Sequence, residues 1–110
     1  MFYTFQNINQ FDSFVKENEA VLAYFSTNEC NVCKVLKPKV EDLFIKEFPQ
    51  VKLAYIETNL LPNVAAQNRI FNVPTIVIYF EGKEYIRKSR SFGIDELKAE
   101  VERPYSLLFS

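Results

Sequence analysis

Residues 20–33 read AVLAYFSTNECNVC, so a run of six apolar residues leads into a pair of cysteines. The run at residues 20–25 does not alternate between polar and apolar positions, which is typical of a strand covered on both faces. The polar residues 26–29 follow as a turn, and Cys30 and Cys33 then stand where a helical pattern begins. We therefore expect a buried strand that carries two cysteines to the start of a helix.

Helical patterns lie on both sides of this strand. Residues 10–19 predict an amphipathic helix capped by Asn9. The pattern after the cysteines runs to Pro49, and Pro38 inside it is expected to kink the helix without ending it. The apolar face of this second helix is expected to consist of Val32, Val35, Leu36, Val40, Leu43, Phe44 and Phe48.

The rest of the chain continues the alternation of helices and strands. We expect a buried strand at 51–57, a short helix at 62–71, a strand at 75–80 and, after a tight turn, its hairpin partner at 83–88. A last helix carries Ile94, Leu97 and Val101, and Pro104 is expected to break it and leave residues 105–110 as a tail. This order predicts an α/β fold, a three-layer sandwich with a central mixed β-sheet flanked by helices.

Composition indicates one globular domain spanning residues 1–110. Apolar residues make up 48% and charged residues 25%, with a formal net charge of -1. The chain lacks the basic run of a nucleic-acid or anionic-membrane protein, and no apolar stretch approaches the ~20 residues that span a bilayer. The first residues do not form a signal-like segment, so we expect a cytoplasmic protein.

The spacing of the two cysteines favours reactivity over stabilisation. A disulfide that closes a loop of about four residues removes only roughly 2 kcal/mol of denatured-state entropy. At a helix N-terminus, unpaired N–H groups and the helix dipole stabilise a thiolate and lower its pKa from about 8.5. Cys33 lies one turn beyond Cys30, within reach of it. The pair is therefore predicted to be a reversible dithiol/disulfide.

Two other interpretations of the cysteines stay open. The pair could supply half of a zinc site shared by two chains, but the sequence has no further Cys and no His, and structural zinc takes four such ligands. The cysteines could also be inert core residues. Redox activity is favoured over both, and no metal site is expected.

The chain resembles the thioredoxin family in five landmarks that follow in order. These landmarks are the apolar strand, the CxxC motif at its end, Pro38, the segment Asn72-Val73-Pro74-Thr75, and Gly93. The resemblance implies that Cys30 is a nucleophile and Cys33 the resolving thiol. It also implies that Pro74 is a cis proline facing the cysteines, and that the Val73 backbone and Gly93 bind substrate. A trans Pro74 that begins an edge strand is the alternative.

The resemblance also implies an activity. Such a protein is a thiol-disulfide oxidoreductase, here a cytoplasmic reductase of protein disulfides, recharged by an external thiol or reductase as electron donor and needing no cofactor. We expect a monomer. The alternative is a protein-binding module of the same fold that docks partners in the Pro74 groove with little or no redox turnover.

Some residues depart from the family pattern. Family members carry Trp-Cys-Gly-Pro-Cys, where this chain has Glu29, Asn31 and Val32 around its cysteines and no Trp. These three residues are expected to tune the motif, although Glu29 can equally be a solvated surface acid. The family's buried aspartate falls at Tyr24, a poor base at neutral pH, and its lysine partner at Leu53.

Basic residues gather in the last third of the chain, where Lys83, Arg87, Lys88 and Arg90 surround the predicted hairpin. They could steer an acidic partner, but a solvated strand face is favoured.

Overall fold

The computed structural model describes residues 1–89 and 92–109. In chain order the elements are β1 (Phe2–Tyr3), α1 (Ile8–Glu17), β2 (Ala20–Ser26), α2 (Asn31–Glu47), β3 (Lys52–Glu57), α3 (Pro62–Gln67), β4 (Thr75–Phe80), β5 (Lys83–Ser89) and α4 (Ile94–Phe109). The alternation expected from the sequence is confirmed. Within these described residues, none of the helices is long and apolar enough to cross a membrane.

The strands form one mixed sheet in the order β1-β3-β2-β4-β5. The central strand β2 runs parallel to β3 and antiparallel to β4. All seven residues of β2 are buried, as the unbroken apolar run predicted. Strands β4 and β5 form a hairpin through Glu81 and Gly82, both with positive φ (53° and 80°), the backbone shape of a two-residue turn.

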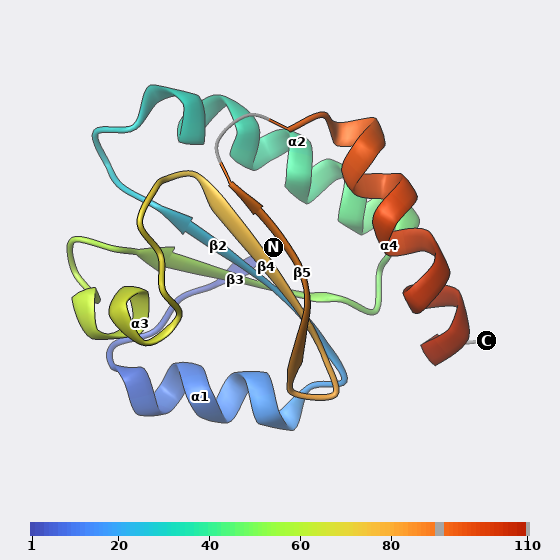
Figure 1. Ribbon diagram of the computed structural model, residues 1–110, viewed down its shortest axis with the longest axis horizontal. Helices are drawn as coiled ribbons and strands as arrows, with labels where there is room; N and C mark the ends of the chain where they lie inside the picture. Colours follow the sequence, from blue (N-terminus) through green and yellow to red (C-terminus); the bar gives the residue numbers. More distant parts are fainter. Residues whose placement is uncertain (90–91, 110) are drawn as a thin grey trace.

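Helices cover both faces of the sheet, as Figure 1 shows: α2 and α4 lie on one side, α1 and α3 on the other. Two apolar clusters fill the layers between them. One cluster contains Leu22, Tyr24 and Ile78 from the sheet with Val40 of α2 and Leu97 of α4. The other contains alternate residues of the same strands together with Phe11, Val15 and Val64. The predicted α/β three-layer sandwich is confirmed.

Helix α2 buries a narrower stripe than its sequence suggests. Its buried residues are Cys33, Val40 and Phe44, and Pro38 lies inside the continuous helix as expected. Val32 and Val35, predicted to lie on the apolar face, are 61% and 60% exposed. That part of the prediction is wrong, because these two side chains flank the stripe that packs on the sheet.

Two helix boundaries and one strand also differ from the prediction. Helix α1 begins at Ile8, and its cap is Asn7, whose side chain accepts a hydrogen bond from the Gln10 N–H at 2.9 Å, so Asn9 is not the cap. Helix α3 ends at Gln67, before the expected end at residue 71. Strand β1 was not predicted, since two residues are too short to show a periodic pattern.

Pro104 does not break the last helix, and the predicted tail is helical through Phe109. A proline removes one N–H from the helix ladder and its ring crowds the carbonyl four residues before it, a cost that tertiary contacts can offset. Tyr105, Leu108 and Phe109 pack against the cluster under α2 and α4, and the Tyr105 ring centroid lies 5.0 Å from that of Phe48. Ser110 lies outside the described residues.

Two of the basic residues of the hairpin are paired within the chain. Arg87 bonds Glu84 on the same strand, and Lys88 bonds Glu96 and Glu100 of α4. Arg90 lies outside the described residues. The pairing of Arg87 and Lys88 weakens the idea that this cluster steers an acidic partner.

Candidate active site

Cys30 and Cys33 meet where the carboxyl end of β2 leads into α2. Their sulfurs form a disulfide bond, with the two Cα atoms 5.2 Å apart. Cys30 is the N-cap residue of α2, and Cys33 stands in the helix's first turn. The strand-to-helix junction predicted from the sequence therefore brings the two thiols within bonding reach.

The two sulfurs have different surroundings. Cys33 is 1% exposed and belongs to the core cluster, whereas Cys30 is half-buried. The Cys33 backbone N–H donates a hydrogen bond of 3.1 Å to the Cys30 sulfur. A helix N-terminus and a donated N–H both favour negative charge on that sulfur. An incoming molecule can therefore reach Cys30, and the fold stabilises its thiolate.

The segment 72–75 lies against the same cluster as the cysteines. The Val73–Pro74 peptide bond is cis, and Pro74 is buried. Val73 is half-buried and packs against the core cluster that contains Cys33. The Thr75 hydroxyl donates a 2.6 Å hydrogen bond to the Asn72 carbonyl, which braces the turn. Val73 and Cys30 therefore pack against the same core cluster, the one that contains Cys33.

Gly93, the remaining predicted binding residue, precedes α4, and its carbonyl accepts the Leu97 N–H at 3.0 Å. A Cβ atom at this position would meet nothing closer than Glu96 atoms at 4.0 Å. Its own surroundings therefore leave room for a side chain.

Tyr24 lies beneath Cys33 and is fully buried. Its hydroxyl donates a 2.6 Å hydrogen bond to the backbone carbonyl of Cys33. Burial raises the pKa of this hydroxyl above its ordinary value of 10.0, and the neighbouring Tyr55 raises it further. The hydroxyl keeps its proton, and its hydrogen bond links β2 to the first turn of α2.

The β3 residue beside Tyr24 is Tyr55, and Leu53 pairs with Leu22 instead. Leu53 is therefore not the residue directly opposite Tyr24 on the neighbouring strand. The rings of Tyr24 and Tyr55 stack with centroids 6.2 Å apart. The ammonium of Lys37, from α2, lies 4.2 Å from the Tyr55 ring centroid, a cation–π contact.

Glu29, Asn31 and Val32, predicted to tune the motif, are all exposed. Sequence reasoning missed two other residues nearby. Phe71, two residues before Val73, is 86% exposed. Glu57 ends β3 opposite Ser26 and is 7% exposed, and neither of its carboxylate oxygens has a hydrogen-bond partner in the described ranges. An aromatic residue beside a predicted binding segment was the one available signal for Phe71.

Comparison with known proteins gives a family match over most of the chain. The family model described as Thioredoxin matches residues 3–103. The chain is 27% identical over 96 residues to the thioredoxin-like protein YdfQ of Bacillus subtilis, covering 87% of this chain and 85% of that protein. It is 32% identical over 76 residues to a thioredoxin of Chlamydia trachomatis, covering 69% of this chain and 71% of that protein.

The fold also resembles that of a solved thioredoxin structure. A mutant thioredoxin from Halobacterium salinarum superposes with a TM-score of 0.80 and 26% identity, covering 90% of this chain and 86% of that one.

Proposed function

Since this chain belongs to the thioredoxin family and is a thiol-disulfide oxidoreductase, we propose that Cys30 is its nucleophile and Cys33 its resolving thiol. The difference in exposure between the two sulfurs carries this proposal. Only the half-buried Cys30 can meet a substrate disulfide directly. The buried Cys33 is placed to attack what Cys30 has bound.

The reaction proceeds in two exchanges. The Cys30 thiolate attacks one sulfur of the substrate disulfide, forms a mixed disulfide and releases the other substrate sulfur as a thiolate, which takes a proton from solvent. Cys33 then loses its proton to solvent and attacks the Cys30 sulfur. The Cys30–Cys33 disulfide forms, and the second substrate thiol leaves. The substrate gains two electrons, and the enzyme loses two.

Substrate binding is assigned to the segment beside the cysteines. The backbone of Val73, presented by the cis Pro74, offers strand-like hydrogen bonds to an extended peptide. Gly93 completes the groove, where the absence of a side chain lets a peptide approach closely. The substrates are protein disulfides.

The residues around the cysteines tune the pair. Asn31 and Val32 set the loop that decides the relative stability of dithiol and disulfide. The charge of Glu29 opposes a thiolate on Cys30, weakly, because Glu29 is exposed and screened by solvent. Tyr24 holds the Cys33 backbone through its hydroxyl.

The direction of electron flow follows from the compartment. A chain whose two cysteines form one reactive pair, without a structural disulfide framework, suits a reducing compartment, and we assign it to the cytoplasm. There the protein acts as a reductase and is recharged by an external thiol or a reductase partner. Residues 1–110 act as one domain and as a monomer, since one chain supplies both cysteines and Val73.

Insulin reduction by dithiothreitol tests this function. The unsubstituted protein should accelerate the reaction, and Cys30→Ser should reduce the rate to that of dithiothreitol alone. Equal rates for the two proteins would contradict the proposal and leave only a protein-binding module of the same fold.

A further inference from the structure

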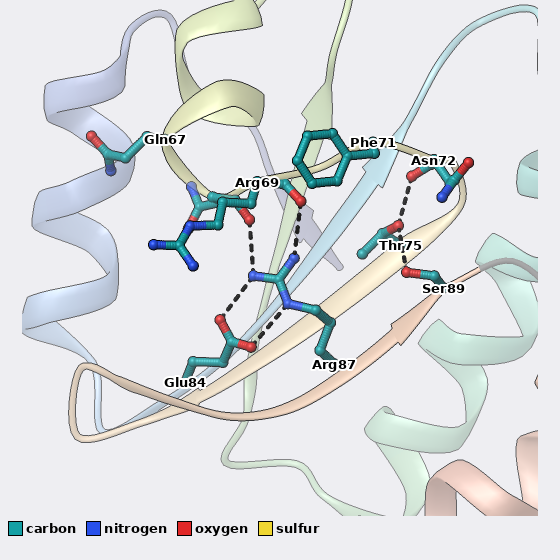
Figure 2. A pocket seen from close by; sticks show the side chains of 9 residues that line it. Gln67, Arg69, Phe71, Asn72, Thr75, Glu84, Arg87 and Ser89 are labelled. Atoms are coloured by element: carbon teal, nitrogen blue, oxygen red, sulfur yellow. Dashed lines mark hydrogen bonds and ion pairs between the residues drawn. The ribbon is translucent and has the colours of Figure 1, made fainter.

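A cavity of about 530 Å³ is lined by residues that precede and follow the Val73–Pro74 segment in the chain. Its lining includes Gln67 at the end of α3 and Arg69 after it, Phe71 and Asn72 before Val73, and Thr75 and Arg87 on the hairpin (Figure 2). Asn72 and Thr75 flank Val73 and Pro74 in sequence. The cavity is therefore continuous with the segment proposed to bind substrate.

Arg87 forms a fixed part of this cavity. Its Nε and Nη2 atoms donate to the two carboxylate oxygens of Glu84 at 2.9 and 2.8 Å. Nη2 and Nη1 also donate to the carbonyls of Asn68 and Arg69, at 2.8 and 3.4 Å. Figure 2 shows the guanidinium held between Glu84 and the turn at residues 68 and 69. Both oxygens of Glu84 are thus already occupied.

Arg69 brings a second positive charge to the same cavity. Its backbone has a φ of 55°, in the left-handed region that few residues other than glycine adopt. Its side chain is exposed, and in residues 1–89 and 92–109 its guanidinium makes no hydrogen bond or ion pair. The lining then carries two guanidinium groups against the single carboxylate of Glu84. The charge of Arg69 also acts on Glu84 and helps to lower the pKa of that carboxyl, so one carboxylate serves two arginines and the lining keeps a net positive charge.

We propose that this cavity is a specificity site that takes an Asp or Glu side chain of the substrate protein, bound by Arg69. The proposal rests on the function assigned above and names the class of substrate it favours. An extended chain advances about 3.3 Å per residue, so a peptide paired with the Val73 backbone passes Phe71 and the cavity within a few residues of its reacting cysteine. The exposed Phe71 ring gives the apolar part of that acidic side chain a surface to pack on.

The binding mode follows from guanidinium chemistry. An arginine offers a planar fork of donors that matches a carboxylate in a bidentate pair, with strength and direction that a lysine lacks. Arg87 is less suited to this role, because four of its five N–H donors are already used by Glu84 and two carbonyls. Arg87 holds the backbone of the turn that carries Arg69, and Arg69 selects the acidic side chain of the substrate.

The test uses two synthetic disulfide peptides that differ only by Glu or Lys at positions near the cysteine. We compare kcat/KM for the unsubstituted protein with Arg69→Asp, Arg69→Asn and Arg69→Lys. Asp and Asn tolerate the left-handed backbone of this position, so these variants keep the turn. Arg103→Asp, an exposed residue of α4, is the control with the same change of charge.

The unsubstituted protein should prefer the Glu peptide over the Lys peptide by about threefold, the size of a partly exposed ion pair. Arg69→Asn should lose the preference, Arg69→Asp should reverse it, and Arg69→Lys should keep part of it. Arg103→Asp should behave like the unsubstituted protein. The preference should shrink as salt is raised. Loss of selectivity in Arg103→Asp, or equal effects of Arg69→Asp on both peptides, would overturn the proposal.

Turnover of hydroxyethyl disulfide, which is small and uncharged, separates this inference from the proposed function. All residue 69 variants should reduce it at the unsubstituted rate, which shows that the cysteine pair is intact. A Cys30→Ser variant that still reduces it would refute the cysteine assignment, whatever residue 69 does. A residue 69 variant that loses it would refute the specificity role, because the defect would then lie in the redox pair.

Discussion

The replacement Tyr24→Phe isolates a single buried hydrogen bond at the redox site. The ring and its stacking on Tyr55 stay in place, so no cavity forms, and only the hydroxyl that donates to the Cys33 carbonyl at 2.6 Å is lost. Cys33 lies in the first turn of α2, so its carbonyl also takes part in the helix ladder, and losing the second donor costs about 0.5 to 1.5 kcal/mol, the value of an ordinary hydrogen bond. The free energy of unfolding should fall by that amount, and Tm by about 4 °C for each kcal/mol in a domain of this size.

Urea unfolding of the oxidised protein measures this loss, as a lower midpoint with an unchanged slope. Tyr85→Phe is the matched control, because Tyr85 is exposed on β5 and its change should stay within about 0.5 kcal/mol. An unfolding midpoint for Tyr24→Phe equal to that of Tyr85→Phe would refute a stabilising role for the hydrogen bond from Tyr24 to Cys33.

The same variant tests whether Tyr24 moves protons. Because the Tyr24 hydroxyl keeps its proton and only donates a hydrogen bond to a carbonyl, the pH profile of mixed-disulfide resolution by Cys33 should not change in Tyr24→Phe. Rapid mixing with a disulfide peptide, followed over a range of pH, gives that profile. A profile displaced along the pH axis would place Tyr24 on the proton path and refute the structural role.

Two further predictions concern carboxylates. Arg87 holds the pKa of Glu84 below its ordinary value of 4.5, so the pair stabilises the fold above that pH, and this stabilisation is lost as pH falls through the lowered pKa of the folded state. Glu84→Gln should therefore lower the free energy of unfolding at neutral pH, and in urea titrations its stability should fall less steeply with acid than that of the unsubstituted protein. An identical fall with acid in the two proteins would contradict this. Glu57→Gln should raise the free energy of unfolding by about 1 kcal/mol or more, because it removes a buried charge without a hydrogen-bond partner in the described part of the chain. Exposed Glu102→Gln serves as its control, and a loss of stability in Glu57→Gln would show that the carboxylate is compensated.

The cysteine site could be predicted because two strong local patterns meet there. The unbroken apolar run of β2 indicates a strand buried on both faces, and the structure buries every residue of it. A helical pattern then starts at the CxxC, which places Cys30 at the N-cap. Burial and helix periodicity are properties of short segments, so sequence alone carries them.

Features set by packing between distant segments could not be predicted. Periodicity assigns Val32 and Val35 to an apolar face, but how much of that face the sheet covers depends on where α2 crosses it. Pro104 has a strong local preference to end a helix, and the packing of Tyr105 on Phe48 overrides it. The neighbour of Tyr24 depends on strand register, which fixes Tyr55 in that place.

The cavity beside Val73 belongs to the same class. It joins the turn after α3 to the hairpin strand β5, and the guanidinium proposed to bind substrate sits on a residue with positive φ. No short pattern in the sequence marks Arg69, whose role becomes visible only once Arg87 is seen to occupy Glu84.

Trapping of the mixed disulfide tests the roles of the two cysteines most directly. A disulfide peptide is mixed with Cys33→Ser or Cys30→Ser, and intact-mass spectrometry counts the peptide bound to each variant. Cys33→Ser should accumulate one peptide on Cys30, and Cys30→Ser should accumulate none, because its remaining sulfur is buried. Peptide held by Cys33 in the Cys30→Ser variant would contradict the assignment.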